Sequence, residues 1–327
     1  MRLLLLFLVI KILRQPEFEE PIGKYAYVTL CSHPHFILNT LVLFHQMAHR
    51  NSARGEYVAL LTDKVTPKYF PLFRHFNIKT KYIDVVTVTG RSIEKRDTFL
   101  WSKLQAWTLV EYEKIVLLDS DIVVIDSLDS LFDYPELSGV SMFDEGEKIA
   151  FYDPHPDWVN GKCLIPRIDD PLPVCIDDRP YYENMTKLSN KIPGFTGLNS
   201  GLMVLVPSLN TFAEMNASLK HSKRRLCCPS QEFVYRFFES RKRFYRLPLK
   251  YHVRRLNRID EQTRKQLERD VLMFHFVERK KPFVRGRRRS LTRFAKDWWD
   301  GFDIVWEILK GSPYTKLLPD LHRMKEL

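Results

Sequence analysis

The chain has 327 residues, of which 45% are hydrophobic and 13% aromatic. This size and composition suffice for one large α/β domain or two small ones, and they exclude a disordered or fibrous chain. The formal net charge is +11, and lysines and arginines crowd residues 279–296. Such a cluster favours phosphate groups or an anionic membrane surface. We expect no nucleic-acid partner, because no nucleic-acid fold signature accompanies the cluster.

The two ends of the chain differ from its middle. Residues 1–24 form an apolar segment and a linker, and the apolar part is too short to span a bilayer but matches the hydrophobic region of a secretory signal. Without a small-residue cleavage site we expect an uncleaved signal anchor in a Golgi or other secretory-pathway membrane. An amphipathic surface helix, a truncated gene start and a cytoplasmic location are the competing interpretations. Residues 284–327 form a basic, aromatic tail, a second route to membrane association, which leaves 25–283 as the main domain.

The five cysteines lack the spacing of a structural zinc site. Cys163 and Cys175 flank a loop rich in proline and aspartate. They either form a disulfide in an oxidising compartment or remain free thiols.

Strand and helix patterns alternate through the first part of the main domain. Apolar periodicity and turn residues predict strand 25–30, helix 36–49, strand 56–61, helix 67–76 and strand 79–86. This βαβαβ order predicts an α/β fold with a Rossmann-like, doubly wound and mostly parallel sheet. In such a sheet, ligands bind outside the carboxyl ends of the strands.

The second part of the main domain contains one long irregular stretch. Residues 144–193 are rich in Asp, Pro and Tyr without clean periodicity, and we expect a loop excursion over the ligand-binding face. The regular elements around it are predicted as helix 103–112, strand 114–118, helical turn 128–132, strand 199–208, helices 209–219 and 231–241, and strand 271–277.

Two carboxylates lie one residue apart at the carboxyl end of the predicted central strand. Asp119 and Asp121 follow the apolar run 114–118, and residues i and i+2 of an extended chain point to the same side, so both can bind one hard cation. An isolated pair of this kind is ordinarily loop solvation or a helix cap, but the buried strand before it favours a functional site. An EF-hand calcium loop is excluded, because its glycine and glutamate positions hold Val124 and Ser130.

A nucleophilic aspartate is the alternative for the same residues. The run from Asp119 to Val123 resembles the signature of haloacid-dehalogenase-type phosphatases. That motif usually opens its domain, whereas here a long alternation of strands and helices comes first.

Several further motifs follow one another in an informative order. They are Tyr27-Val28-Thr29-Leu30, Ser102-Lys103-Leu104 with Trp107, Leu118-Asp119-Ser120-Asp121, Asn199-Ser200-Gly201, Gln231, and His275 with Lys281-Pro282-Phe283. In this order they resemble the retaining glycosyltransferases of family 8, the group of glycogenin and galactinol synthase, over residues 25–283. The resemblance implies a GT-A type fold, with the irregular stretch as an acceptor-side loop excursion.

The resemblance also implies a UDP-sugar donor and a divalent cation. Asp119, Asp121 and His275 are then the metal ligands, and nitrogen ligation favours Mn²⁺ over Ca²⁺, with Mg²⁺ as the alternative. Lys103 and Lys281 then neutralise the diphosphate as the sugar leaves.

The remaining implied residues contact the donor or act in catalysis. Gln231 is the implied catalytic residue that steadies positive charge at the sugar ring, with Lys103 as its partner in catalysis. The resemblance assigns the donor contacts to Leu30, Ser32 and Phe36 at the uridine, Ser120 at the ribose, Asn199 and Ser200 at the donor sugar, and Lys281 at the diphosphate.

The chain departs from the family pattern at three positions. Ser230 replaces the acidic residue that commonly precedes the glutamine, Glu278 replaces a glycine of glycogenin-like members, and Phe283 replaces a closing tryptophan. These departures bear on the identity of the donor sugar and on activity more than on the fold.

The sequence therefore predicts a metal-dependent, retaining hexosyltransferase that moves a hexose from a UDP-sugar to a hydroxyl group of a carbohydrate, polyol or glycoprotein. Two alternatives stay open. One is the aspartate-nucleophile phosphatase, and the other is a degenerate transferase fold that serves as a binding or scaffold protein.

Overall fold

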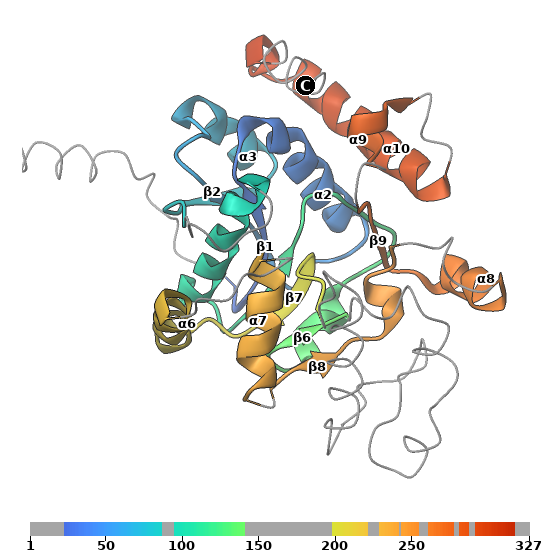
Figure 1. Ribbon diagram of the computed structural model, residues 1–327. Coiled ribbons are helices and arrows are strands. Elements are labelled where there is room, and N and C mark those ends of the chain that lie inside the picture. The colour runs from blue at the N-terminus through green and yellow to red at the C-terminus, as the bar shows by residue number, and fades with distance from the viewer. Residues whose placement is uncertain are drawn as a thin grey trace, which may run out of the picture.

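A central β-sheet organises the part of the chain that the structure describes (Figure 1). The structure is a computed structural model that describes residues 23–86, 95–140, 198–221, 229–241, 243–254, 261–277, 281–287 and 292–317. The strands of this sheet are β1 (Tyr25–Cys31), β2 (Glu56–Leu61), β3 (Ile78–Tyr82), β4 (Lys114–Leu118), β6 (Ser138–Gly139), β7 (Leu202–Leu205) and β8 (Tyr245–Arg246). Among the described residues their spatial order is β3-β2-β1-β4-β7-β6-β8.

The first four strands along the chain are parallel to one another. β1 pairs with β2 and β4, and β2 pairs with β3, whereas β7 is antiparallel to β4 and β6 is antiparallel to β7. The connections are α2 (Ile37–His49) and α3 (Phe70–His75), each entered through a proline-initiated 3₁₀ turn, η1 (Pro34–Phe36) or η2 (Pro67–Tyr69). The predicted βαβαβ unit and the mostly parallel α/β sheet are confirmed.

Alternating side chains of the central strands face two separate cores. In β1, Tyr27 belongs to the core that contains α2 and α3, whereas its neighbour Val28 belongs to a second core with Trp101 and Trp107. The second core is covered by η3 (Lys95–Thr108), α6 (Leu209–His221) and α7 (Pro229–Glu239). Because both faces are covered, these strands are buried and mostly apolar.

The element before β4 differs in its bounds from the predicted helix 103–112. Residues 95–108 form the 3₁₀ segment η3, and the chain then turns into β4. The amide of Leu109 donates to Ala106 O at 3.3 Å, and the amide of Tyr112 donates to Leu109 O at 3.0 Å, both with the three-residue spacing of a 3₁₀ turn. The Thr108 hydroxyl also donates to Gln105 O at 2.8 Å, which competes with helical backbone bonding. The predicted helix is therefore present in part, as a 3₁₀ segment that ends at Thr108.

The apolar run around the two aspartates is divided between two sheets. β4 ends at Leu118 in the central sheet, and β5 (Ile122–Val124) pairs with β9 (Met273–His275) in a separate antiparallel pair. The chain therefore turns a corner at Asp119, Ser120 and Asp121, and strand β9 runs alongside the exit from that corner.

The C-terminal residues include a long helix against the domain. α10 (Arg293–Lys310) packs on α2 and follows the short helix α9 (Pro282–Arg285), as the red elements of Figure 1 show. Trp298 and Phe302 are buried in the same core as α2. The Gln46 side chain donates to Asp297 O at 2.9 Å, and a Cβ atom at Gly301 would lie 2.5 Å from Gln46 Nε2. Glycine thus permits the close crossing of the two helices, and residues 293–310 share the core rather than forming a solvated tail.

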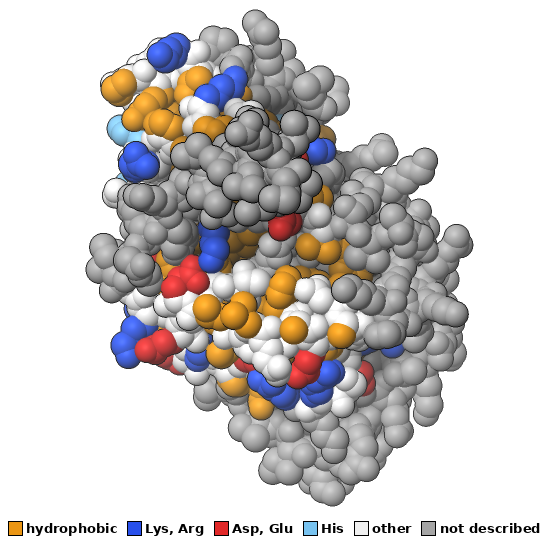
Figure 2. Space-filling view, turned by 90° about the vertical axis from the view of Figure 1, so that its left-hand side faces the viewer, with side chains coloured by type: hydrophobic (Ala, Val, Ile, Leu, Met, Phe, Trp, Pro, Cys, Tyr) orange, Lys and Arg blue, Asp and Glu red, His pale blue; other side chains and the backbone are white. Residues whose placement is uncertain are grey.

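The remaining described elements are η4 (Asp129–Asp133), η6 (Leu249–Tyr251), α8 (Glu261–Asp270) and η9 (Thr315–Leu317). On the face drawn in Figure 2, positive and negative side chains lie beside one another around hydrophobic ones. Lysines and arginines of the described residues form ion pairs with neighbouring carboxylates, such as Lys81–Glu111 at 3.0 Å and Arg241–Glu214 at 3.2 Å.

Within the described residues, no helix combines the length and apolar character needed to cross a membrane.

Candidate functional site

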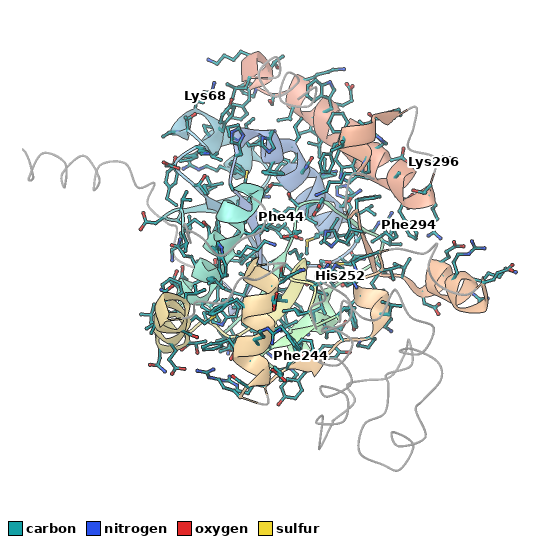
Figure 3. All side chains as sticks on the ribbon, in the orientation of Figure 1. Phe44, Lys68, Phe244, His252, Phe294 and Lys296 are labelled. Carbon is teal, nitrogen blue, oxygen red and sulfur yellow. The ribbon has the colours of Figure 1, made fainter. Side chains whose placement is uncertain are left out.

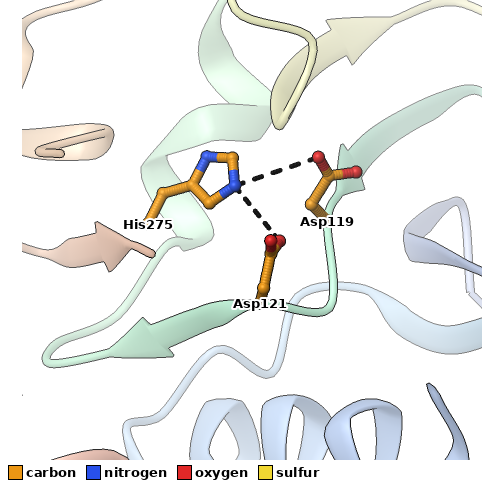
Figure 4. Close-up of side chains that lie close together, drawn as sticks. All are labelled: Asp119, Asp121 and His275. Carbon is orange, nitrogen blue, oxygen red and sulfur yellow. Dashed lines mark ion pairs between the residues drawn. The ribbon is translucent and has the colours of Figure 1, made fainter. Parts of the chain in front are cut away.

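Two carboxylates and one imidazole converge at the corner between the two sheets (Figure 4). Ligand atoms of Asp119, Asp121 and His275 all lie within 4.8 Å of one another. His275 Nε2 is 3.1 Å from Asp121 Oδ1 and 4.0 Å from Asp119 Oδ2. The three side chains that the family resemblance implies as metal ligands thus lie together in the structure.

Backbone hydrogen bonds hold each of these residues in place. The Asp119 amide donates to Gly201 O at 3.0 Å, and Asp121 O accepts from the Phe276 amide at 2.9 Å. Ile122 is paired with His275 in the register of β5 and β9. The corner is therefore fixed by the start of β7 on one side and by the end of β9 on the other.

Two lysines neutralise the two carboxylates. The Lys103 ammonium donates to Asp119 Oδ1, and the Lys281 ammonium donates to Asp121 Oδ2. Lys103 comes from η3 and is buried, whereas Lys281 caps the N-terminus of α9 and its side chain is 29% exposed. Burial raises the pKa of the Asp121 carboxyl, but His275 and Lys281 outweigh this effect and hold that pKa well below its usual range. The carboxylate therefore stays ionised and ready to bind a cation.

A second histidine, His252, supports the first. Its Nε2 lies 2.8 Å from His275 Nδ1, and the two rings meet edge to edge, with centroids 5.0 Å apart and planes inclined by 14°. His252 is fully buried, and burial, together with Arg254, lowers its pKa well below the ordinary value, so the ring is neutral. Sequence reasoning missed this residue, because a single histidine between η6 and a short bridge carries no spacing signal.

Glycine is also needed at residue 201, close to the His275 ring. A Cβ atom at Gly201 would lie 2.6 Å from His275 Nδ1 and 2.9 Å from Asn199 Oδ1. The Asn199 side chain in turn accepts from the Gly201 amide at 2.9 Å. The Asn-Ser-Gly motif thus brings the start of β7 into direct contact with the imidazole, a role that the motif alone does not reveal.

Gln231 is linked to the same motif. Its side-chain oxygen accepts from the Ser200 amide at 3.2 Å, which holds the amide group beside Asn199 and Gly201. The next residue, Glu232, is buried and accepts from Arg236 at 2.9 Å along α7. Adjacent helical side chains point about 100° apart. The Gln231 amide group therefore faces Ser200, whereas the Glu232 carboxylate faces Arg236.

The residues expected at the nucleotide lie around the carboxyl end of β1. Leu30 belongs to β1, and Ser32 and Phe36 follow it, with Ser32 O accepting from Thr62 Oγ1 at 2.6 Å. β1 is the neighbour of β4, so this end adjoins the aspartate corner, where Ser120 is buried. Their contacts with a nucleotide remain predictions.

Of the three departures from the family pattern, two lie in described residues. Ser230 is buried at the start of α7, and the Phe283 ring lies 5.5 Å from that of Trp298 in α10. The predictions on Glu278, Cys163, Cys175 and the 144–193 excursion fall outside the residues that the structure describes.

Comparisons with known sequences agree with the expected family. The family model "Glycosyl transferase family 8" matches residues 27–285. Glycogenin-1 of Caenorhabditis elegans is 29% identical over 121 residues, which cover 36% of this chain and 28% of the relative. Galactinol synthase 2 of Solanum lycopersicum is 26% identical over 210 residues, 62% of this chain and 56% of the relative. The matched region is thus less than two thirds of the length of these relatives.

Solved structures share the architecture at low sequence identity. The galactosyltransferase LgtC, solved with donor and acceptor sugar analogs, has a TM-score of 0.55 at 14% identity, covering 88% of this chain and 99% of LgtC. The bifunctional glycosyltransferase WbbM has a TM-score of 0.56 at 19% identity, covering 89% of this chain and 52% of WbbM. These likenesses confirm the GT-A type of α/β fold. With the family model spanning most of the main domain and its expected motifs assembled in space, the chain belongs to glycosyl transferase family 8.

Proposed function

We propose that this protein transfers a hexose from a UDP-sugar to a hydroxyl group of a carbohydrate, polyol or glycoprotein, with retention of anomeric configuration and with Mn²⁺ as cofactor. The observation that carries the proposal is the convergence of Asp119, Asp121 and His275 between Lys103 and Lys281. This group lies where β4 ends, the side of a doubly wound sheet at which ligands bind.

The donor atoms present fit a divalent transition metal. Asp119 and Asp121 supply hard, ionised oxygens and His275 supplies a nitrogen, a mixture that suits Mn²⁺ better than Ca²⁺. A bound cation supplies positive charge that stabilises the leaving diphosphate. Lys103 and Lys281, now paired with the carboxylates, are placed to donate to phosphate oxygens instead.

The charges of the site explain why nucleotide and cation would bind together. Two carboxylates and two ammonium groups balance one another in the structure. A divalent cation alone would leave an excess positive charge in a largely buried site, and a diphosphate alone an excess negative charge, both of which are costly. Bound together, they restore the balance.

Retention is attributed to departure and attack on one face of the sugar. The bond between the anomeric carbon and the diphosphate breaks, the acceptor oxygen bonds to that carbon from the same side, and its proton passes to the leaving diphosphate. Gln231 is a feeble nucleophile, and its oxygen, held by Ser200, instead stabilises positive charge on the sugar ring. Glu232 is engaged by Arg236 and so is not offered as a covalent nucleophile.

The two alternatives are less well supported. The match to the family model includes the aspartate motif, so this motif belongs to a glycosyl transferase domain. The phosphatase hypothesis is supported by the local resemblance of residues 119–123 alone. A degenerate scaffold has no need to keep a complete charged site, yet the carboxylates, the imidazole and both lysines meet here.

The test combines nucleotide binding with product analysis. Calorimetric titration of UDP should show binding with Mn²⁺ that is lost in chelator and in Asp121→Asn, because an amide cannot replace an ionised ligand. Hydrolysis of a panel of UDP-sugars would then identify the donor, and NMR would read the anomeric configuration of the product. Equal UDP binding in chelator would refute the metal-dependent function, and an inverted product would refute the retaining mechanism.

A further inference from the structure

We infer that His252 is a positioning residue that orients the metal-binding face of His275 through an imidazole–imidazole hydrogen bond. The inference rests on the proposed function, because it assigns how one ligand of the proposed cation site is held. His252 is fully buried, and Figure 3 shows it inside the fold.

The two ring nitrogens of His275 face different partners. Nε2 faces the carboxylates, at 3.1 Å from Asp121 Oδ1, and is the nitrogen that would bind a cation with its lone pair. A neutral imidazole then carries its proton on Nδ1. That nitrogen lies 2.8 Å from His252 Nε2, which is therefore the acceptor. Metal-binding histidines usually donate this second N–H to a carboxylate, carbonyl or water, and here the acceptor is another imidazole.

The backbone holds the two rings in this register. The His275 amide donates to Val253 O at 2.8 Å, and the Val253 amide donates to Met273 O at 3.2 Å. Residues 252 and 275 are thus placed side by side by the bridge between Val253 and β9. A Cβ atom at Gly201 would lie 2.6 Å from His275 Nδ1, so the backbone at Gly201 packs closely against the ring. His275 therefore has both the ring nitrogen of His252 and the backbone at Gly201 close to its Nδ1.

The buried Nδ1 of His252 has no hydrogen-bond partner among the residues that the structure describes. A histidine that only filled the core would carry this unsatisfied atom at a cost that an apolar side chain avoids. The one polar contact of its ring that the structure assigns is the contact with His275. Its position therefore favours a role toward that ligand.

The test measures the affinity for Mn²⁺ in the presence of UDP, by electron paramagnetic resonance of the free ion. His252→Phe keeps an aromatic ring but removes the acceptor, and we expect the affinity to fall by about 10- to 100-fold, the usual effect of losing such a partner. His252→Gln restores an acceptor oxygen at similar reach and should recover most of the affinity. Tyr251→Phe, which removes the 2.7 Å contact with Ser130 in the same segment, should leave the affinity unchanged.

A second measurement uses the wild-type chain. With UDP and diamagnetic Zn²⁺ in place of Mn²⁺, imidazole ¹⁵N NMR should show His275 protonated at Nδ1 and His252 unprotonated at Nε2. Wild-type affinity in His252→Phe, no recovery in His252→Gln, or protonation of His252 at Nε2 would overturn the inference. Absence of Mn²⁺ binding in the wild-type chain would instead refute the proposed function, so the two failures are distinguishable.

Discussion

The charge balance of the site predicts that removing the Lys281 ammonium changes the affinities for Mn²⁺ and for UDP in opposite directions. Lys281 donates to Asp121 in the absence of ligands, so its ammonium competes with a cation for that carboxylate. After Lys281→Met, which keeps the apolar stem, we expect Mn²⁺ alone to bind more tightly. With Mn²⁺ saturating, UDP should bind more weakly, because the diphosphate loses a charged donor.

The exposure of the Lys281–Asp121 pair, combined with Coulomb's law, sets the expected size of the changes in Mn²⁺ and UDP affinity. At an effective dielectric of about 20, unit charges about 4 Å apart attract by about 4 kcal/mol. The Lys281 side chain is 29% exposed and that of Asp121 is 13% exposed, so solvent and the flexible stem recover much of this energy. We expect a gain of at least about 1.4 kcal/mol in Mn²⁺ binding, which is about tenfold in the dissociation constant. The loss for UDP should be about 1.5 to 3 kcal/mol, the range for hydrogen bonds to charged groups.

Titration calorimetry of the wild type and of Lys281→Met, first with Mn²⁺ and then with UDP, measures both affinities. Lys79→Met is the matched control, because it removes a comparably buried pair with Glu56, 3.2 Å long with side chains 13% and 17% exposed. Glu56 begins β2, at the amino end of a strand parallel to β4, whereas the site lies at the carboxyl end of β4, so neither affinity should change. An Mn²⁺ affinity that falls or stays constant in Lys281→Met would refute the competition between lysine and cation.

Three further predictions concern catalysis, reactivity and stability. Gln231→Ala should lower kcat with little change in donor KM, whereas Glu232→Ala should act through stability or the acceptor; mass-spectrometric detection of a sugar on Glu232 would contradict this. Burial raises the pKa of Cys31 to about 12, so iodoacetamide at pH 8 should label it in urea but not in the native protein, as peptide mapping will show. Trp298→Ala should cost about 3–5 kcal/mol of unfolding free energy, and the exposed Ile304→Ala on the same helix less than about 0.5 kcal/mol, both measured by urea denaturation.

Much of the site follows from local sequence patterns. The apolar run before Asp119 identifies a buried strand, and the carboxyl end of such a strand is where ligands bind, so the position of the carboxylates could be predicted. The geometry used for that prediction was only partly right. The chain does not continue as one strand through Asp121 but turns from one sheet into another, and the two carboxylates converge across that corner. The lysines and His275 were assigned by family resemblance, since nothing local distinguishes them from other lysines and histidines.

Contacts between distant segments that the family resemblance does not include could not be predicted. His252 acts on His275 only because η6 and β9 lie side by side, and no residue spacing records that proximity. From the sequence, Gly201 resembles a turn residue. In the structure it lies against the His275 ring, where a Cβ atom would clash. Both are consequences of tertiary packing, which single-sequence periodicity does not describe.

The C-terminal helix shows how composition can hide structure. Basic residues dominate the segment before α10 and suggest a solvated tail, yet Phe294, Trp298 and Phe302 recur every four residues and form one apolar face. That face packs on α2, and Trp298 also contacts Phe283, two residues beyond Lys281. α10 lies beyond residue 285, where the match to the family model ends. The lysine that neutralises Asp121 is therefore supported by a helix outside the matched region, and loss of α10 should weaken the site as well as the fold.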